Sequence, residues 1–91
     1  MFYLDNAATT EVSPFFINDA KFILSAHWEN ASSNSIKGRE ARQFVETARL
    51  RAATAIGASP NQIIFTSGGS ESNALALNGW KSIYTSSVEH H

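Results

Sequence analysis

The chain is 91 residues long, 43% of its residues are apolar, and its formal net charge is −1 at pH 7. A chain of this length forms one small domain at most, and its seven scattered Lys and Arg residues make no basic patch for nucleic acid or an anionic membrane. The absence of cysteine excludes disulfides, thiolate metal sites and thiol nucleophiles within this sequence. We expect no metal site, no transmembrane segment and no signal peptide, and hence a cytoplasmic protein.

The first element is a short apolar segment at 2–4, which we predict to be a strand. Asp5 and Asn6 interrupt it, and the small residues that follow are typical of a turn. Ser13 and Pro14 then indicate the start of a helix, with serine as the cap and proline at the first helical position.

That helix carries one apolar stripe at helical spacing, which we expect to be buried. The stripe consists of Phe16, Ala20, Ile23, Leu24 and His27. A lone histidine at a helix end more often pairs with the helix dipole than binds a metal. Residues 29–35 then read ENASSNS, a polar sequence that predicts a loop.

A long second helix is predicted to open at Gly38 and to end at Ile56, with Gly57 as its C-terminal cap. Its expected buried stripe is Ala41, Phe44, Val45, Ala48, Ala52, Ala55 and Ile56. The arginines of this helix fall mostly on the other face, and their simplest interpretation is a solvated surface. Pro60 prevents the helix from resuming, so residues 58–61 are predicted to turn into the next strand.

The stretch with the most chemical content is 63–73, which reads IIFTSGGSESN. Its order predicts a buried strand at 63–65, a glycine turn and the start of a helix. The first N–H groups of a helix lack intrahelical partners, so this turn is suited to an anion such as phosphate. The hydroxyls of Ser67, Ser70 and Ser72 add possible donors. A plain connection between strand and helix explains the same spacing equally well.

Three residues of this turn have features of their own. Gly68 and Gly69 permit positive φ angles and a close approach of the backbone to a ligand. Glu71 suits the positive end of the helix dipole, yet its charge would repel a phosphate if the side chain pointed inward.

The helix is predicted to continue to Leu77, and a further strand is predicted at 82–86. This order of elements predicts an α/β fold with its ligand site beyond the carboxyl ends of the strands.

Four sequence motifs span nearly the whole chain. They are YLDNAATT at 3–10, NASS at 30–33 with Gly38 and Arg39 after it, FTSGGSES at 65–72, and TSSVEH at 85–90. Together and in this order they resemble the N-terminal part of a cysteine desulfurase, a pyridoxal-phosphate-dependent enzyme of the class V aminotransferase type. The resemblance implies that residues 1–91 form a single partial domain. That domain would be the N-terminal segment of the large domain of a fold type I enzyme, with helices packed on a partial sheet.

The resemblance also implies roles for individual residues. Gly69 and Ser70 match the small residue and the threonine that hold the phosphate of pyridoxal 5′-phosphate. His90 matches a histidine that stacks on the pyridine ring and takes part in proton transfer, which makes it a catalytic and a cofactor-binding candidate. A third set matches a segment near the substrate pocket, namely Asn6, Ala7, Ala8 and Thr9.

The activity implied by the resemblance is sulfur transfer from L-cysteine, for iron–sulfur clusters or thiocofactors, by a homo-oligomeric enzyme. The family's Schiff-base lysine, pyridinium-pairing aspartate and persulfide cysteine have no match here, so we predict that this chain alone is inactive.

The chain also departs from the family's pattern at two positions. Ala74 stands where the family usually has asparagine, and Ser35 where it often has histidine or tyrosine. His90 and His91 also fit the stub of a purification tag. The alternative is that the chain is a non-catalytic small α/β domain, whose function is to bind a phosphate ligand or a protein partner.

Overall fold

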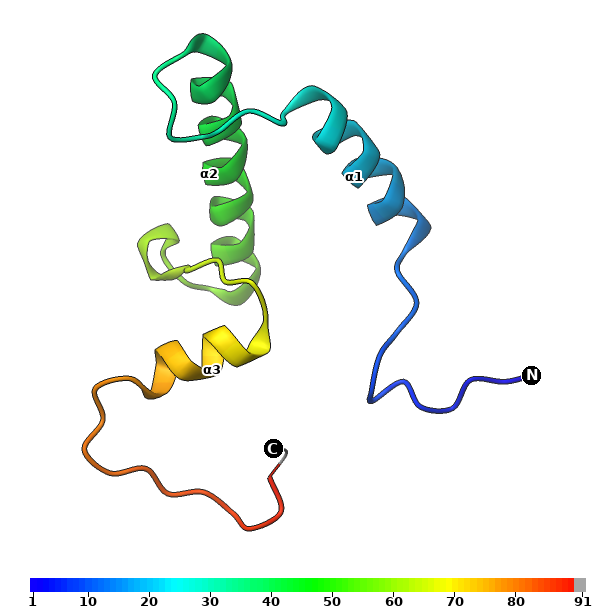
Figure 1. Ribbon diagram of the computed structural model, residues 1–91, viewed down its shortest axis with the longest axis vertical. Helices are drawn as coiled ribbons and strands as arrows, with labels where there is room; N and C mark the ends of the chain where they lie inside the picture. The colour runs from blue at the N-terminus through cyan, green and yellow to red at the C-terminus, as the bar shows by residue number, and fades with distance from the viewer. Residues whose placement is uncertain (90–91) are drawn as a thin grey trace.

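The computed structural model describes residues 1–89, in which three α-helices and a short 3₁₀ helix are joined by irregular segments (Figure 1). In chain order the helices are α1 (Pro14–Ala26), α2 (Ile36–Ile56), η1 (Pro60–Gln62) and α3 (Gly69–Leu77). Within the described residues no β-strand is formed, so the strands predicted at 2–4, 63–65 and 82–86 are absent there. The partial sheet of the predicted α/β fold is therefore not confirmed.

The absence of these strands has a physical reason. A strand is stabilised by hydrogen bonds to a neighbouring strand, and a parallel sheet needs several strands that are covered on both faces. Ile63 has the backbone angles of a strand, with φ −97° and ψ 124°, but no residue of the described chain pairs with it in a ladder. The segment 63–65 is therefore extended and unpaired.

The described chain is open. Its radius of gyration is 17.6 Å, against about 12 Å for a compact domain of this length. Its accessible surface is 8555 Å², well above the roughly 5200 Å² of a folded chain of this mass. Among residues 1–89, only Gly38, Ala41 and Ala53 are buried, and all three belong to α2. None of the helices in this part of the chain combines the length and the apolar character that crossing a bilayer requires.

Helix α1 begins where the sequence indicates. Pro14 lies in its first turn and the Ser13 carbonyl accepts a hydrogen bond from the Ile17 N–H at 3.1 Å, although the Ser13 side chain makes no capping bond. The expectation that the stripe of α1 is buried is wrong, because α1 and α2 leave an open groove between them. Phe16 and Leu24 are exposed, and Ala20, Ile23 and His27 are partly covered.

Aromatic rings make the contact between α1 and α2. The His27 ring, just after α1, stacks on Phe44 of α2 with ring centroids 4.9 Å apart and an interplanar angle of 21°. Phe22 meets the same ring edge to face at 5.8 Å. The His27 N–H also donates to the Ile23 carbonyl at 2.8 Å. His27 thus ends α1 and links it to α2, and no group of three potential metal ligands occurs within residues 1–89.

Helix α2 begins at Ile36, two residues earlier than predicted, because Ser35 caps it. The Ser35 hydroxyl accepts a hydrogen bond from the Gly38 N–H at 3.0 Å. Gly38 is required by packing, since a β-carbon there would lie 2.6 Å from the Ser33 carbonyl oxygen and 2.9 Å from that of Asn30. The loop before α2 therefore lies directly against its first turn.

The end of α2 follows the sequence prediction. Gly57 adopts the left-handed conformation, with φ 70° and ψ 27°, and its N–H donates to the carbonyls of Ala53 and Thr54. Pro60 then begins η1, which packs back on α2. The expectation that the stripe of α2 is buried holds only at Ala41. Ala52 is partly covered, and the exposed members are Phe44, Val45, Ala48, Ala55 and Ile56. Ala53, which is fully buried, lies outside that stripe.

Candidate functional site

The predicted glycine turn lies between the extended segment and α3. Gly68 precedes the helix, and the Ser72 N–H donates a hydrogen bond to the Gly68 carbonyl at 3.1 Å. The N–H groups of Gly69, Ser70 and Glu71 therefore precede the first helical hydrogen bond and have no acceptor inside the helix. Because Gly68 has no side chain, it cannot cap them. The start of α3 thus presents three N–H donors at the positive end of the helix dipole.

The two glycines of the turn do not use the left-handed conformation that their residue type allows. Gly68 has φ 167°, which is extended backbone, and among residues 1–89 the glycines in the left-handed region are Gly57 and Gly79. The left-handed conformation that these glycines permit is therefore not used in this turn. A β-carbon at Gly68 or Gly69 would meet no atom within 4 Å. The backbone of the turn is accessible to a ligand.

Hydroxyl groups hold the turn together. Thr66 Oγ1 lies 2.6 Å from Ser72 Oγ and donates to the Gly68 carbonyl at 3.2 Å. Ser72 Oγ donates to the same carbonyl at 3.1 Å. These bonds join Thr66 to the first turn of α3. The hydroxyls of Ser67 and Ser72 are engaged within the protein, so Ser70 is the remaining candidate among the three predicted donors.

Glu71 closes the turn from its helical side. Its carboxylate accepts hydrogen bonds from the Ser67 hydroxyl at 2.5 Å and from the Ser67 N–H at 2.7 Å. The hydroxyl bond first, and the N–H bond next, hold the pKa of Glu71 below its ordinary value of 4.5. The side chain therefore folds back onto Ser67, and its negative charge stays at the start of α3.

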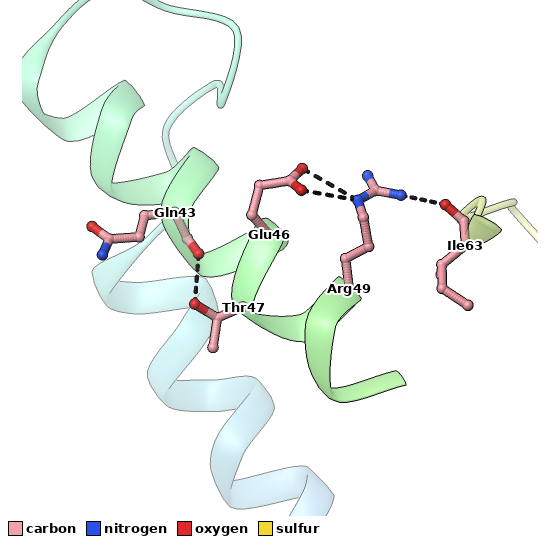
Figure 2. A network of polar contacts seen from close by, with 5 residues as sticks. All are labelled: Gln43, Glu46, Thr47, Arg49 and Ile63. Atoms are coloured by element: carbon pink, nitrogen blue, oxygen red, sulfur yellow. Dashed lines mark hydrogen bonds and ion pairs between the residues drawn. The ribbon is translucent and has the colours of Figure 1, made fainter. Parts of the chain in front are cut away.

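Arg49 of α2 anchors the segment that precedes the turn. Figure 2 shows its guanidinium between the Glu46 carboxylate and the Ile63 carbonyl. Nη1 donates to the Ile63 oxygen at 2.5 Å, and Nε lies 3.1 Å from Glu46 Oε2. The guanidinium also lies over the Phe65 ring, 4.9 Å from its centroid. The interpretation of these arginines as a solvated face is wrong for Arg49, whose side chain is only 24% exposed.

Two further arginines of α2 bind the loop that precedes it. Arg39 Nη1 donates to the Asn34 carbonyl at 2.9 Å, and Arg42 Nε donates to the Ala31 carbonyl at 2.8 Å. Sequence reasoning missed these contacts because an arginine-rich helix face has the same pattern whether water or a neighbouring backbone accepts its hydrogen bonds. The available signal was the polar loop at 29–35, which lies next to this arginine-rich helix in the sequence.

The residues predicted to lie near the substrate, 6–9, are not gathered at this turn. Residues 6–9 lie in an exposed turn that the Ala8 N–H closes onto the Asp5 carbonyl at 3.1 Å. In Figure 1 this blue N-terminal segment lies to the right of α3 and apart from it. His90 lies outside the described residues. The structure thus places residues 69 and 70 at the start of α3 and residues 6–9 apart from them.

A groove between α1 and α2 is a separate feature of the surface. Its apolar lining includes Phe16, Phe22, Ile23 and Phe44. None of the predicted site residues within the described chain lines it. The groove is therefore distinct from the candidate site at residues 68–70.

Comparisons with known proteins relate the chain to much longer sequences. The family model described as "Aminotransferase class-V" matches residues 2–91. The chain is similar to "Cysteine desulfurase IscS" of Dictyoglomus turgidum, with 45% identity over 97 residues, which cover 98% of this chain and 25% of the relative. It is also similar to "IscS-like cysteine desulfurase" of Mycobacterium tuberculosis, with 42% identity over 102 residues, which cover 100% of this chain and 26% of the relative.

A differently named relative is "Selenocysteine lyase" of Rattus norvegicus, with 42% identity over 76 residues, covering 84% of this chain and 18% of the relative. The chain thus spans about a quarter or less of the length of these curated relatives. No solved structure matches the chain.

Proposed function

Because the chain belongs to the class-V aminotransferase family, we propose that it is the N-terminal part of a pyridoxal-phosphate-dependent cysteine desulfurase. The observation that carries the proposal is the start of α3. There the N–H groups of Gly69 and Ser70 are free of helical acceptors and the backbone faces open space. A phosphate group fits such donors, and the Ser70 hydroxyl supplies a further one. We assign the phosphate of the cofactor to residues 69 and 70.

The proposed substrate of the whole enzyme is L-cysteine, whose sulfur would be supplied to iron–sulfur clusters or thiocofactors. Two relatives named as cysteine desulfurases align with 98% and 100% of this chain, whereas the one named as a selenocysteine lyase aligns with 84%. The names of these two desulfurases are the support for cysteine as the proposed substrate. The enzyme is proposed to be a cytoplasmic homo-oligomer.

The residues of this chain would have limited roles in that enzyme. Pyridoxal 5′-phosphate, when bound, supplies the electron sink for bond changes at the amino-acid substrate. Gly69 and Ser70 would bind its phosphate, His90 would lie against its ring and hold a proton, and residues 6–9 would line the substrate side. Because the sequence contains no cysteine and no lysine in a matching motif, we propose that this chain alone binds the phosphate group without completing the reaction.

Titration of the isotope-labelled chain with inorganic phosphate tests this proposal. We expect the amide signals of Gly69 and Ser70 to move progressively, while the amides of α1 stay in place. A second titration uses pyridoxal 5′-phosphate. The desulfurase proposal predicts tighter binding of this cofactor than of inorganic phosphate, whereas a non-catalytic phosphate-binding domain predicts equal affinity. Movement of other amides with these two unchanged would contradict both functions.

A further inference from the structure

We propose that Arg49 is a positioning residue for the phosphate-binding turn, and that it acts through the segment 63–65 without touching the ligand. This inference rests on the proposed function, since it assigns Arg49 a part in the phosphate site at residues 68–70. Arg49 lies on α2, outside the four sequence motifs, and no chemistry of the proposed reaction assigns it a role.

The guanidinium of Arg49 holds the segment at two points. It donates a hydrogen bond to the Ile63 carbonyl, and its central carbon lies over the Phe65 ring, 4.9 Å from the centroid. The same group thus contacts the backbone of Ile63 and the side chain of Phe65, two positions further along the chain. The Glu46 carboxylate, 3.1 Å from Nε, fixes the guanidinium from the helix side. This arrangement restricts both the position and the orientation of the segment.

The restraint continues from this segment into the turn. Phe65 is followed by Thr66, whose hydroxyl is bonded to Ser72 in the first turn of α3 and to the Gly68 carbonyl. A continuous path of contacts therefore runs from α2 through Arg49 to the residues that would bind phosphate. The path passes through backbone and hydroxyl groups that have defined positions in the structure.

The anchor matters because residues 63–68 have neither helix nor strand to order them. An extended segment without ladder partners is free to adopt many conformations, and ordering it costs conformational entropy. The apparent affinity of a site falls with the fraction of molecules that hold the binding-competent arrangement. Arg49 raises that fraction, so its loss weakens phosphate binding even though the ligand contacts remain intact.

Lysine cannot replace this arginine. An ammonium group keeps the charge and one hydrogen bond, but it lacks the planar fork that binds a carbonyl, a carboxylate and a ring together. Comparison of Arg49→Lys with Arg49→Met therefore separates positioning from simple charge. Positioning predicts that both variants lose phosphate affinity, whereas an electrostatic role predicts that the lysine variant keeps it.

The experiment compares these variants with Arg42→Lys, which is matched because Arg42 also donates to a backbone carbonyl from α2, but on the loop before the helix. Amide spectra are recorded without ligand and during titration with inorganic phosphate. We expect both Arg49 variants to bind phosphate roughly two- to fivefold more weakly. We also expect the ligand-free amide signals of Thr66 and Ser67 to move, with α2 still protected from hydrogen exchange. Arg42→Lys should leave the turn and its affinity unchanged.

Two results would overturn the positioning role, namely ligand-free turn signals unchanged in Arg49→Met, or an Arg49→Lys variant with full phosphate affinity. If the unmodified chain gives no phosphate response at Gly69 and Ser70, the phosphate site of the proposed function fails. The ligand-free comparison judges Arg49 independently of that outcome. Loss of protection throughout α2 in both Arg49 variants would also count against positioning, since it would show a general structural role.

Discussion

The carboxylate of Glu71 accepts two hydrogen bonds from Ser67, one from its N–H at 2.7 Å and one from its hydroxyl at 2.5 Å. A side chain from the first turn of α3 thus binds the residue that precedes the glycine turn. The same bonds hold a negative charge beside the N–H groups that would receive a phosphate. Since like charges repel, binding of phosphate to this chain should be weak, and Glu71 should respond to pH.

The first prediction concerns the ionisation of Glu71. Its pKa in the folded chain lies below the ordinary value of 4.5, because Ser67 binds the charged form. The folded state therefore gives up this proton more readily than the unfolded state does. The resulting stabilisation is present above pH 4.5 and is lost as the pH falls through the lowered pKa. A pH titration that follows the Glu71 carboxyl carbon and the Ser67 amide by NMR should show both moving together below pH 4.5.

The matched control is Ser67→Ala, which removes the hydroxyl donor and keeps the N–H donor. We expect the pKa of Glu71 to rise toward its ordinary value in this variant, because the hydroxyl bond is the larger of the two causes. A Glu71 carboxyl that already titrates at its ordinary value in the unmodified chain would contradict the hydrogen bonds to Ser67.

The second prediction concerns two glycines in different surroundings. Gly38→Ala should destabilise the chain by about 1–3 kcal/mol, because its β-carbon would overlap the Ser33 carbonyl oxygen at 2.6 Å. Gly69→Ala is the control, since its β-carbon would meet no atom within 4 Å. Urea unfolding followed by circular dichroism should place the Gly69 variant within a few tenths of a kcal/mol of the unmodified chain. Equal losses in both variants would refute the close contact at Gly38.

The sequence predicts the helices better than the strands because helices depend on local signals. Pro14 and Gly57 act through their own backbone geometry, so α1 begins and α2 ends where these residues indicate. A strand depends on partners elsewhere in the chain, and the apolar residues at 63–65 carry no information on whether a partner is present. The same limit applies to burial, since the stripe on α1 shows an apolar face without showing what covers it.

The candidate site also combines a local feature, which the sequence predicts, with a long-range contact, which it does not. The helix start after Gly68 follows from local sequence, and the structure contains it. The contact between Arg49 and Ile63 joins residues 14 positions apart, and no spacing rule predicts it. The role of residues 6–9 near the substrate stays a prediction, which depends on long-range packing. The helix start at the site could therefore be predicted from this sequence, whereas the long-range contact that supports it could not.

The third prediction concerns the Ser70 hydroxyl. Ser70→Ala removes one donor from the proposed phosphate site and should weaken inorganic phosphate binding roughly two- to tenfold. The control is Ser25→Ala on α1, where the hydroxyl donates to the Phe22 carbonyl at 2.9 Å, away from the turn. Affinities come from amide shifts of Gly69 during titration. Equal affinity in the two variants would remove Ser70 from the site.

The fourth prediction concerns activity. With L-cysteine and pyridoxal 5′-phosphate, the isolated 91-residue chain should release no sulfide above the background of the free cofactor, because the chain has no cysteine and no lysine in the family's cofactor-binding position. The full-length desulfurase of Dictyoglomus turgidum, the relative with 45% identity, is the positive control in the same sulfide assay. Turnover by the isolated chain would show that another group on it substitutes for the missing residues.

The last prediction concerns assembly. The accessible surface of the chain exceeds that of a compact chain of the same mass by roughly 3000 Å², whereas a stable interface needs only about 800 Å² from each partner. Burial of one large apolar side chain contributes about 1.5–3 kcal/mol, so covering the groove between α1 and α2 with a second copy is favourable.

We expect sedimentation to show dimers or larger species. The groove residues, and Phe44 and Phe65 with them, should be covered in the interface between the copies. Phe16→Asp, on the groove, should shift the equilibrium toward monomer, whereas Leu24→Asp, on the same helix but outside the groove lining, should not. A strictly monomeric chain with well-protected amides at high concentration would show instead that these helices close a core of their own.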